Sequence, residues 1–287
     1  MEEIVLHNGM KMPKLGLGGD GVYGGEDAYH SDLAKAQYDI YCYAMQTGKC
    51  RLFDTSLSYG WNENILGDAI RDAGKRSDIL IMSKIGNRAQ REHNVRKAFE
   101  ESLRRLKTDY LDIYLIHWPQ TGTFVETYLE MEKLYEEGLV KAIGVCNCQK
   151  HHLEELRQMA NIVPMVHEYE LHPLFTQEAI CNYCYAYDIG VVAYSPLGRM
   201  HDVLIRARPI RDLAKKYDRS PVQIILRWHY QRGRVAIPQT QNRKHFDEIF
   251  AIEEFELTER EVALVSSLND GVRLRYNSDT CDFGALG

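Results

Sequence analysis

The feature that most constrains this chain is a repeated alternation of short apolar runs with longer stretches of helical periodicity. Eight apolar runs occur, and polar or turn-forming residues close each of them. These runs predict strands at Lys14–Gly18, Arg51–Asp54, Ile79–Lys84, Leu111–His117, Val140–Val145, Met165–Glu168, Val191–Tyr194 and Val235–Ile237. Such alternation is typical of β-α-β units, in which consecutive strands lie parallel in one sheet.

The intervening stretches place apolar residues at steps of three and four, the spacing of one face of a helix. Three sets carry the pattern: Val95, Phe99, Leu103 and Leu106; Phe124, Met131, Leu134 and Tyr135; and Leu153, Leu156 and Met159. Gly138 follows the second set and predicts the end of that helix. Thr258 and Glu261 have the spacing of a capping box, which predicts a further helix.

The length of 287 residues fits one closed α/β barrel, which typically needs ~250 residues. No low-complexity linker divides the chain, so we expect a single domain over residues 1–287 with the (β/α)8 TIM-barrel fold. An N-terminal β-hairpin is expected at Ile4–Met12, with Asn8 and Gly9 at its turn. The aperiodic stretch from Asp270 to Gly287 predicts a C-terminal tail loop.

A doubly wound open sheet is the structural competitor. Residues 16–21, with glycine at positions 16, 18 and 21, match the Gly-x-Gly-x-x-Gly spacing of dinucleotide-binding turns. The match is weak evidence, because no clean helix with an acidic strand end ~20 residues later follows it. In a barrel, chemistry gathers at the carboxyl ends of the strands, and that rule directs the search for a site.

Composition excludes several classes of protein. The formal net charge of −6 is unlike the basic surface of a nucleic-acid-binding protein. No apolar run approaches the ~20 residues of a membrane span, and the acidic start lacks the pattern of a secretory signal. Seven cysteines, an odd number, indicate reduced thiols. We therefore expect a cytoplasmic protein, a monomer or weak homo-oligomer, without nucleic-acid or membrane partners.

One cysteine pair, Cys181-x-x-Cys184, has the spacing of a redox or metal motif. It occurs once and within a helical stretch, which favours ordinary packed cysteines. No metal site is expected.

The second, third and fourth predicted strands end in Asp54, Lys84 and His117, and Tyr59 follows the first of these residues by five positions. All four are expected at one mouth of the barrel. A buried lysine beside a tyrosine favours the phenolate, which would lower the phenol pKa from ~10. The aspartate would keep the lysine charged, and the imidazole would orient a carbonyl oxygen. The four together predict a proton donor and an oxyanion site that need no metal.

The sequence resembles the aldo-keto reductase family over nearly its whole length. The matching stretches are Asn8-Gly9-x-Lys11-Met12-Pro13, Leu15-Gly16-Leu17-Gly18, Phe53-Asp54-Thr55-Ser56, Asn62-Glu63, Ser83-Lys84, Ser102-Leu103-Arg104-Arg105-Leu106, Asp109-Tyr110-Leu111-Asp112, Leu115-Ile116-His117-Trp118-Pro119, Ile143-Gly144-Val145-Cys146-Asn147, His172-Pro173, Tyr194-Ser195-Pro196-Leu197-Gly198 and Ile237-Pro238.

The resemblance implies a catalytic tetrad of Asp54, Tyr59, Lys84 and His117, with Tyr59 as the proton donor to a small-molecule carbonyl substrate. It implies hydride transfer from a nicotinamide cofactor that lies extended in the barrel mouth. The residues that it assigns to the cofactor are Gly19, Asn147, Glu168, Tyr194, Ser195, Leu197, Gly198, Arg199, Gln239, Thr240, Gln241 and His245. Those that it assigns to the substrate are Asp20, Tyr23 and Trp118. The tail closes over the substrate in this family, which makes Arg273, Arg275 and Tyr276 candidates for that role, and an exposed position explains them equally.

The chain departs from the family pattern at both ends of the cofactor. Glu168 replaces a glutamine; if ionised, it accepts hydrogen bonds but donates none, so altered cofactor affinity is expected. Gln239 and His245 replace the lysine and arginine that hold the 2′-phosphate of NADPH in many members. NADPH is the expected cofactor, with NADH as its rival. Asp20 stands where many members carry an aromatic residue, which would favour polar or cationic substrates, although a turn-forming aspartate between glycines is the preferred explanation.

Two other functions remain open at the level of sequence. One is a barrel that binds the cofactor to sense redox state, with little turnover. The other is an unrelated barrel, such as a lyase or isomerase, that uses Lys84 as a Schiff base.

Overall fold

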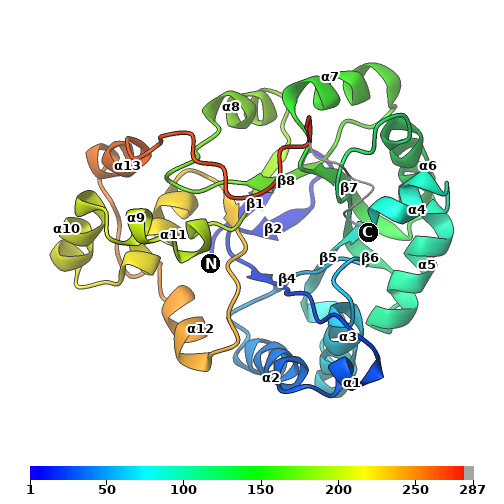
Figure 1. Ribbon diagram of the computed structural model, residues 1–287, viewed down its shortest axis with the longest axis horizontal. Helices are drawn as coiled ribbons and strands as arrows, with labels where there is room; N and C mark the ends of the chain where they lie inside the picture. Colours follow the sequence, from blue (N-terminus) through cyan, green and yellow to red (C-terminus); the bar gives the residue numbers. More distant parts are fainter. Residues whose placement is uncertain (281–287) are drawn as a thin grey trace.

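The structure, a computed structural model, describes residues 1–280, so the predictions for Cys281 and for the tail to Gly287 lie partly or wholly outside the described residues. One sheet has eight parallel strands in the order β10-β9-β8-β7-β6-β5-β4-β3, and helices surround it (Figure 1). The strands are β3 (Leu17–Gly18), β4 (Leu52–Asp54), β5 (Leu80–Ile85), β6 (Leu111–Ile116), β7 (Val140–Cys146), β8 (Val166–Glu170), β9 (Gly190–Tyr194) and β10 (Val235–Ala236).

The two edges of this sheet meet and close the barrel. Leu15 forms a parallel bridge with Ala236, and the Gly18 amide donates to the Pro238 carbonyl at 2.9 Å. Closure confirms the predicted (β/α)8 fold and excludes the open doubly wound sheet. The first strand is shorter than predicted. Only Leu17–Gly18 form ladder pairs with β4, whereas Lys14–Gly16 make isolated hydrogen bonds where the two sheet edges meet.

The predicted N-terminal hairpin is confirmed. β1 (Glu3–Val5) and β2 (Lys11–Pro13) pair in antiparallel register, with Gly9 in the left-handed region at the turn. The buried residues Leu6 and Met12 share an apolar cluster with Leu52, Val166 and Val235, the first residues of β4, β8 and β10. The hairpin therefore closes the amino-terminal end of the barrel and leaves the carboxyl ends of the strands for a site.

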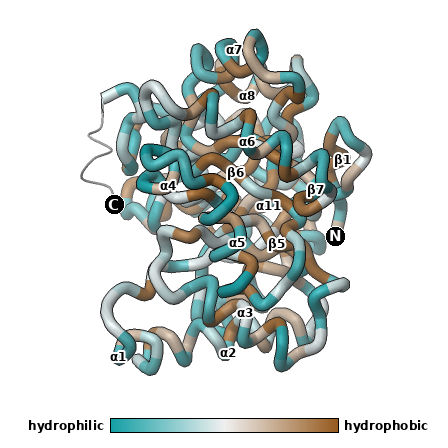
Figure 2. The backbone as a smooth tube through the Cα atoms, turned by 90° about the vertical axis from the view of Figure 1, so that its right-hand side faces the viewer, coloured by the Kyte–Doolittle hydropathy of each residue, from teal (hydrophilic) through white to brown (hydrophobic). Residues whose placement is uncertain are grey.

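The larger helices cover the outer face of the sheet. They are α2 (Asp32–Thr47), α3 (Asn62–Ala73), α5 (Val95–Leu106), α6 (Phe124–Glu136), α7 (Lys150–Met159), α8 (Glu178–Ala186), α10 (Arg208–Tyr217), α11 (Pro221–Gln231), α12 (Arg243–Ile249) and α13 (Glu259–Ser266). The short ones are α1 (Glu26–Tyr29), α4 (Asn87–Arg91), α9 (Asp202–Ile205), η1 (Arg76–Asp78) and η2 (Gly198–Met200). In Figure 2 hydrophobic segments gather around β5 to β7, whereas α4 and the loop near α1 are largely hydrophilic.

The helices predicted from periodicity are confirmed as α5, α6 and α7. Gly138 has a φ of 76° just after α6, as a left-handed helix end requires. The predicted capping box opens α13, where the Thr258 and Glu261 side chains each bond the other's backbone amide. Cys181 and Cys184 are buried on α8 and free, which agrees with packed cysteines. Among residues 1–280, no helix has the length and apolar character needed to cross a bilayer.

Gly67 sets how closely α3 approaches α5. A Cβ atom at this position would lie 2.3 Å from the Arg105 carbonyl oxygen, which is backbone and yields little. We expect Gly67→Ala to lower the free energy of unfolding by about 2–3 kcal/mol, measured by urea denaturation. Gly25→Ala is the control, because a Cβ there meets no atom within 4 Å. Equal stabilities of the two variants would contradict this account of the packing.

Candidate active site

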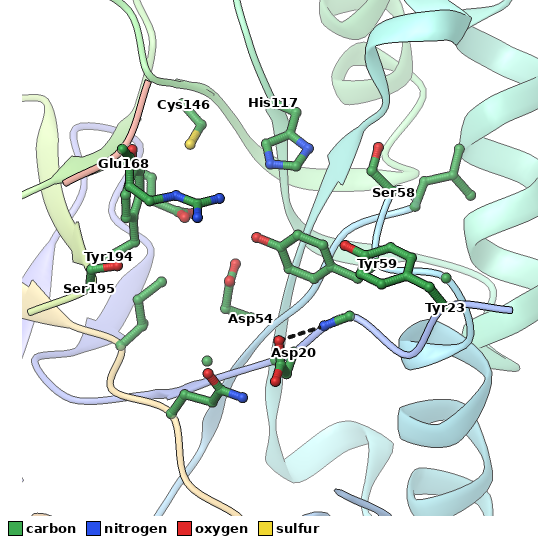
Figure 3. Close-up of a pocket in the computed structure, with 18 of the residues that line it drawn as sticks. Asp20, Tyr23, Asp54, Ser58, Tyr59, His117, Cys146, Glu168, Tyr194 and Ser195 are labelled. Atoms are coloured by element: carbon green, nitrogen blue, oxygen red, sulfur yellow. Dashed lines mark hydrogen bonds between the residues drawn. The ribbon is translucent and has the colours of Figure 1, made fainter. Parts of the chain in front are cut away.

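A cleft of about 1240 Å³ opens at the carboxyl ends of the barrel strands. The sequence-predicted residues that line it are Gly19, Asp20, Tyr23, Asp54, Tyr59, His117, Trp118, Asn147, Glu168, Tyr194, Ser195, Leu197, Arg199 and Gln239, together with Arg275 and Tyr276 of the tail. Figure 3 shows Asp20, Tyr23 and Ser58 on one side of this space and Glu168, Tyr194 and Ser195 on the other, with Tyr59 between them.

Five other residues of the prediction do not line the cleft. Lys84 lies beneath its floor, fully buried. Gly198, Thr240, Gln241 and His245 belong to the segments beside the cleft, and their cofactor contacts stay predictions. The His245 amide and the Thr240 hydroxyl both bond Asn242, the residue that caps α12.

Three buried ionisable side chains meet under the floor of the cleft. Lys84 of β5 donates to the Asp54 carboxylate of β4 and, at 3.1 Å, to the Thr55 carbonyl. Glu168 of β8 brings its Oε2 to 3.2 Å from the Lys84 nitrogen. Burial alone would lower the pKa of Lys84, but the charges of Asp54 and Glu168 outweigh it and raise that pKa. Lys84 is therefore a cation at neutral pH, as the sequence predicts.

The two carboxyls of this centre differ from ordinary surface acids. Burial raises the pKa of Asp54, although Lys84 opposes the effect. Burial, reinforced by the charge of Asp54, raises the pKa of Glu168 to about 8. The Oε2 of Glu168 is ion-paired with Lys84 but accepts no hydrogen bond from any described residue, so this carboxyl in the cleft wall keeps unused accepting capacity.

Tyr59 and His117 lie against each other above this centre. Their rings are 5.6 Å apart and nearly perpendicular, and the Lys84 nitrogen is 5.6 Å from the Tyr59 ring centre. Burial raises the pKa of Tyr59 above its usual 10 despite the opposing charge of Lys84. The expected lowering of this pKa is therefore wrong for the structure as it stands, because desolvation of the phenolate outweighs the lysine. The phenol keeps its proton, as a proton donor must.

His117 is a neutral imidazole. Burial, and then the charges of Lys84 and Arg275, lower its pKa to about 3. Its Nδ1 lies 3.1 Å from the Ser56 hydroxyl, which leaves Nε2 as the ring nitrogen that a ligand can reach. The backbone carbonyl of His117 accepts from the side-chain amide of Asn147 at 3.0 Å. Hydrogen bonds therefore hold the histidine at both its backbone and its ring.

Residues at the ends of β7 and β9 form the opposite wall. The Tyr194 hydroxyl donates to the Asn147 side-chain oxygen at 2.6 Å. Asn147, Ser195 and Arg199 all have positive φ, between 46° and 62°, although none is glycine. Such conformations cost energy and cluster at functional sites, because they direct side chains into positions that ordinary backbone does not allow.

The tail completes the cleft through Glu170, at the end of β8. Its carboxylate accepts from the Leu274 amide at 2.6 Å, from the Arg275 amide at 2.9 Å and from His172 at 3.0 Å. This attachment places Arg275 and Tyr276 in the cleft wall, with the Tyr276 ring 6.4 Å from Trp118. These two tail residues thus line the cleft, and their closure over a substrate stays a prediction.

The third tail residue of that prediction, Arg273, does not line the cleft. Its guanidinium lies 4.6 Å from the centre of the Phe175 ring instead. Asp20 does line the cleft, and its carboxylate also accepts from the Gly21 amide at 2.9 Å, so its turn-forming role is real as well.

Glu170→Gln is expected to loosen the tail. The amide keeps the size but replaces one accepting oxygen by a donor that faces backbone N–H groups, at a cost of about 1–3 kcal/mol of stability. Burial alone would raise the pKa of Glu170, but its bonds to His172, Leu274 and Arg275 lower it. The stabilisation is therefore present above the unfolded pKa of ~4.3 and lost as pH falls through the folded value.

The measurement is urea denaturation at several pH values, with hydrogen exchange of the Leu274 and Arg275 amides. The difference between wild type and Glu170→Gln should shrink in acid. Unchanged exchange at these two amides would show that Glu170 does not hold the tail.

Sequence reasoning missed Ser56, Cys146 and Glu170. Cys146 lines the cleft, and its sulfur accepts from the side-chain amide of Asn147 at 3.1 Å. For Glu170 a signal existed, because two acidic residues two positions apart in one buried strand, Glu168 and Glu170, both need partners. Ser56 and Cys146 carry no comparable sequence signal.

Comparisons with known proteins agree with this geometry. A sequence model described as the aldo/keto reductase family matches residues 14–270. The chain is 38% identical over 278 residues to the 9,11-endoperoxide prostaglandin H2 reductase of Trypanosoma cruzi (strain CL Brener), covering 96% of this chain and 94% of that protein. It is 39% identical over 279 residues to the glyoxal reductase of Bacillus subtilis (strain 168), covering 97% and 96%.

Solved structures give the same result. An aldo-keto reductase from a Medee basin deep-sea metagenome library, MGS-M4, superposes with a TM-score of 0.88 at 34% identity, covering 97% of this chain and 99% of that one. The aldo/keto reductase of Brucella melitensis superposes with a TM-score of 0.84 at 33% identity, covering 93% and 99%.

Proposed function

The chain belongs to the aldo/keto reductase family, and is thus an oxidoreductase; from this premise we propose that it reduces a small aldehyde, ketone or sugar carbonyl with NAD(P)H, or runs the reverse oxidation. The observation that carries the proposal is the convergence of Tyr59, His117 and the Lys84–Asp54 pair at one point of the cleft. The name of one relative mentions glyoxal, a dicarbonyl compound, and agrees with carbonyl reduction, whereas the name of the other specifies an endoperoxide.

Each residue of this set has a role that its surroundings support. Tyr59 is the general acid, because its phenol is protonated at neutral pH and faces the cleft. Neutral His117 holds the carbonyl oxygen through Nε2. Lys84, kept charged by Asp54, stabilises the negative charge that appears on Tyr59 after the proton leaves. In the oxidation the same phenolate takes the proton back.

The cleft also fits a nicotinamide cofactor. Glu168 lines the cleft and accepts no hydrogen bond at Oε2 within the described residues, so its carboxyl can accept from a carboxamide NH2. Tyr194 presents a ring that its bond to Asn147 fixes in place. Such a cofactor supplies the hydride. Ser195, Leu197 and Arg199 line the same cleft and are proposed to lie along the pyrophosphate.

The proposal is tested with purified protein, NADPH and NADH, and a panel of aldehydes, ketones and sugars. Loss of reduced-nicotinamide absorbance that depends on a carbonyl compound is the expected result. Cofactor binding without turnover on the whole panel would favour a redox-sensing barrel. Borohydride trapping of a substrate on Lys84 would instead support Schiff-base chemistry.

We propose NADPH as the cofactor, with NADH as its rival. Gln239 is exposed at the cleft, where a cation would meet the 2′-phosphate of NADPH. Gln239→Lys is therefore expected to raise the preference for NADPH over NADH about tenfold, measured as the ratio of the two Kd values. Gln239→Met, which adds no charge, should leave the ratio unchanged. An equal gain in both variants would place the 2′-phosphate elsewhere.

We further propose that the protein works in the cytoplasm as a monomer or weak homo-oligomer. The location is supported by the cysteines, which are all free within the described part of the chain.

A further inference from the structure

The catalytic centre holds one cation against two carboxyls. Asp54, Lys84 and Glu168 are 3%, 0% and 1% exposed, so none is solvated by bulk water. If both carboxyls were ionised, the centre would carry a net charge of −1, and an uncompensated charge is costly to bury. The geometry therefore favours one retained proton on the two carboxyls beside the charged lysine.

Contacts with Lys84 decide which carboxyl keeps that proton. Asp54 accepts a direct hydrogen bond from the ammonium, and Thr55 accepts another. Glu168 forms an ion pair with the ammonium through Oε2 at 3.2 Å, but this oxygen accepts no hydrogen bond from any of residues 1–280. Since Asp54 has the better contact with the cation, Glu168 is the carboxyl that binds and releases the proton.

The other groups that face Glu168 are neutral. Burial raises the pKa of Cys146 on β7, of Tyr59 and of Tyr194 on β9, and burial lowers that of His117. Glu170 on the same strand and Arg275 of the tail are further charges near this wall; both act on Tyr194, and Arg275 also acts on His117. Lys84 and Asp54 thus dominate the electrostatics of Glu168 from within the barrel.

We propose that Glu168 discriminates between the two redox forms of the nicotinamide: ionised, it favours the cationic oxidised ring, and protonated, it favours the neutral reduced ring. This inference rests on the proposed function, since it requires the nicotinamide to lie beside Glu168. A protonated glutamate offers one donor and one acceptor to the carboxamide, much as a glutamine does. An ionised one adds a negative charge beside a positive ring in a site with little water.

A linkage follows. The oxidised form binds more tightly as pH rises through the pKa of Glu168, and its binding at neutral pH releases a proton. The reduced form shows the opposite, weaker trend. Low pH therefore favours binding of the reduced cofactor, which carbonyl reduction needs. High pH favours binding of the oxidised cofactor, which alcohol oxidation needs.

The test measures binding rather than turnover. The Kd values of NADP⁺ and NADPH are determined by tyrosine and tryptophan fluorescence from about pH 6 to about pH 9. The ratio of the oxidised to the reduced Kd should fall about tenfold or more over this range, and proton release on NADP⁺ binding should appear in a weakly buffered indicator solution.

Glu168→Gln keeps the shape and removes the titrating group, so the ratio should become independent of pH and the proton release should vanish. Glu63→Gln is the matched control, because Glu63 is also fully buried with a raised pKa but does not line the cleft. It should behave as wild type does.

A flat ratio in the wild type, or a pH dependence that persists in Glu168→Gln, would overturn the role of Glu168 alone. Failure of both cofactor forms to bind would overturn the proposed function and this inference with it. Proton release is measured on the wild type, so the proposal stays falsifiable even if a variant folds poorly.

Discussion

Tyr59→Phe is expected to reduce turnover by about 10²- to 10⁴-fold while leaving cofactor affinity within a few fold of wild type. The substitution removes one oxygen and keeps the ring, which packs at 80° to His117. The transferred proton has no other source of matching position, because His117 is neutral and Lys84 is buried beneath the floor. Steady-state kinetics and cofactor titration on the same preparation check both halves of the prediction.

Tyr38→Phe is the control. It removes the hydroxyl of Tyr38, a residue of α2 away from the cleft. That hydroxyl donates to Asp72 at 2.9 Å. Its turnover should match wild type. Wild-type turnover in Tyr59→Phe would exclude Tyr59 as the general acid.

Lys84→Met is expected to lower the free energy of unfolding by about 3–5 kcal/mol, as well as to suppress turnover. The substitution leaves Asp54 and Glu168 buried without a cation. Their folded pKa values, already raised, must rise further. The stability that such groups contribute is fully present below the unfolded pKa and is lost as pH rises through the folded pKa. The loss should therefore grow as pH rises from about 5 to about 9, when measured by urea denaturation.

Lys35→Met removes a lysine whose ion pair with Asp32, at 3.5 Å, is fully solvated. Its effect should stay within about 0.5 kcal/mol at every pH. A comparable, pH-independent loss in the two variants would mean that Lys84 contributes packing rather than charge.

Much of the fold was predictable because each local signal agreed with the barrel. The alternating pattern located all eight strands, although some of their ends differ from the prediction by up to three residues. β6 ends at Ile116, one residue before His117, and β8 runs on to Glu170. Strand ends depend on the neighbouring ladder, and the sequence of a single strand does not contain that neighbour.

The sequence predicted which residues meet at the candidate site, but it did not predict how burial and charge together set their pKa values. The strand-end positions and the family resemblance identified Tyr59, Lys84 and His117 together, and the structure brings them together. The direction of the Tyr59 pKa was missed, because it depends on how completely the phenol is removed from water, which only the three-dimensional packing determines. For the same reason the replacement at 168 looked like a change in cofactor contacts, and its proximity to Lys84 was not apparent.

The attachment of the tail to Glu170 has one more consequence. Its two tail donors are backbone amides, which are present whatever side chains positions 275 and 276 carry. Those side chains can therefore be exchanged without detaching the segment. Natural or laboratory selection can therefore change which substrates enter the cleft, while the proton-transfer residues below keep their arrangement.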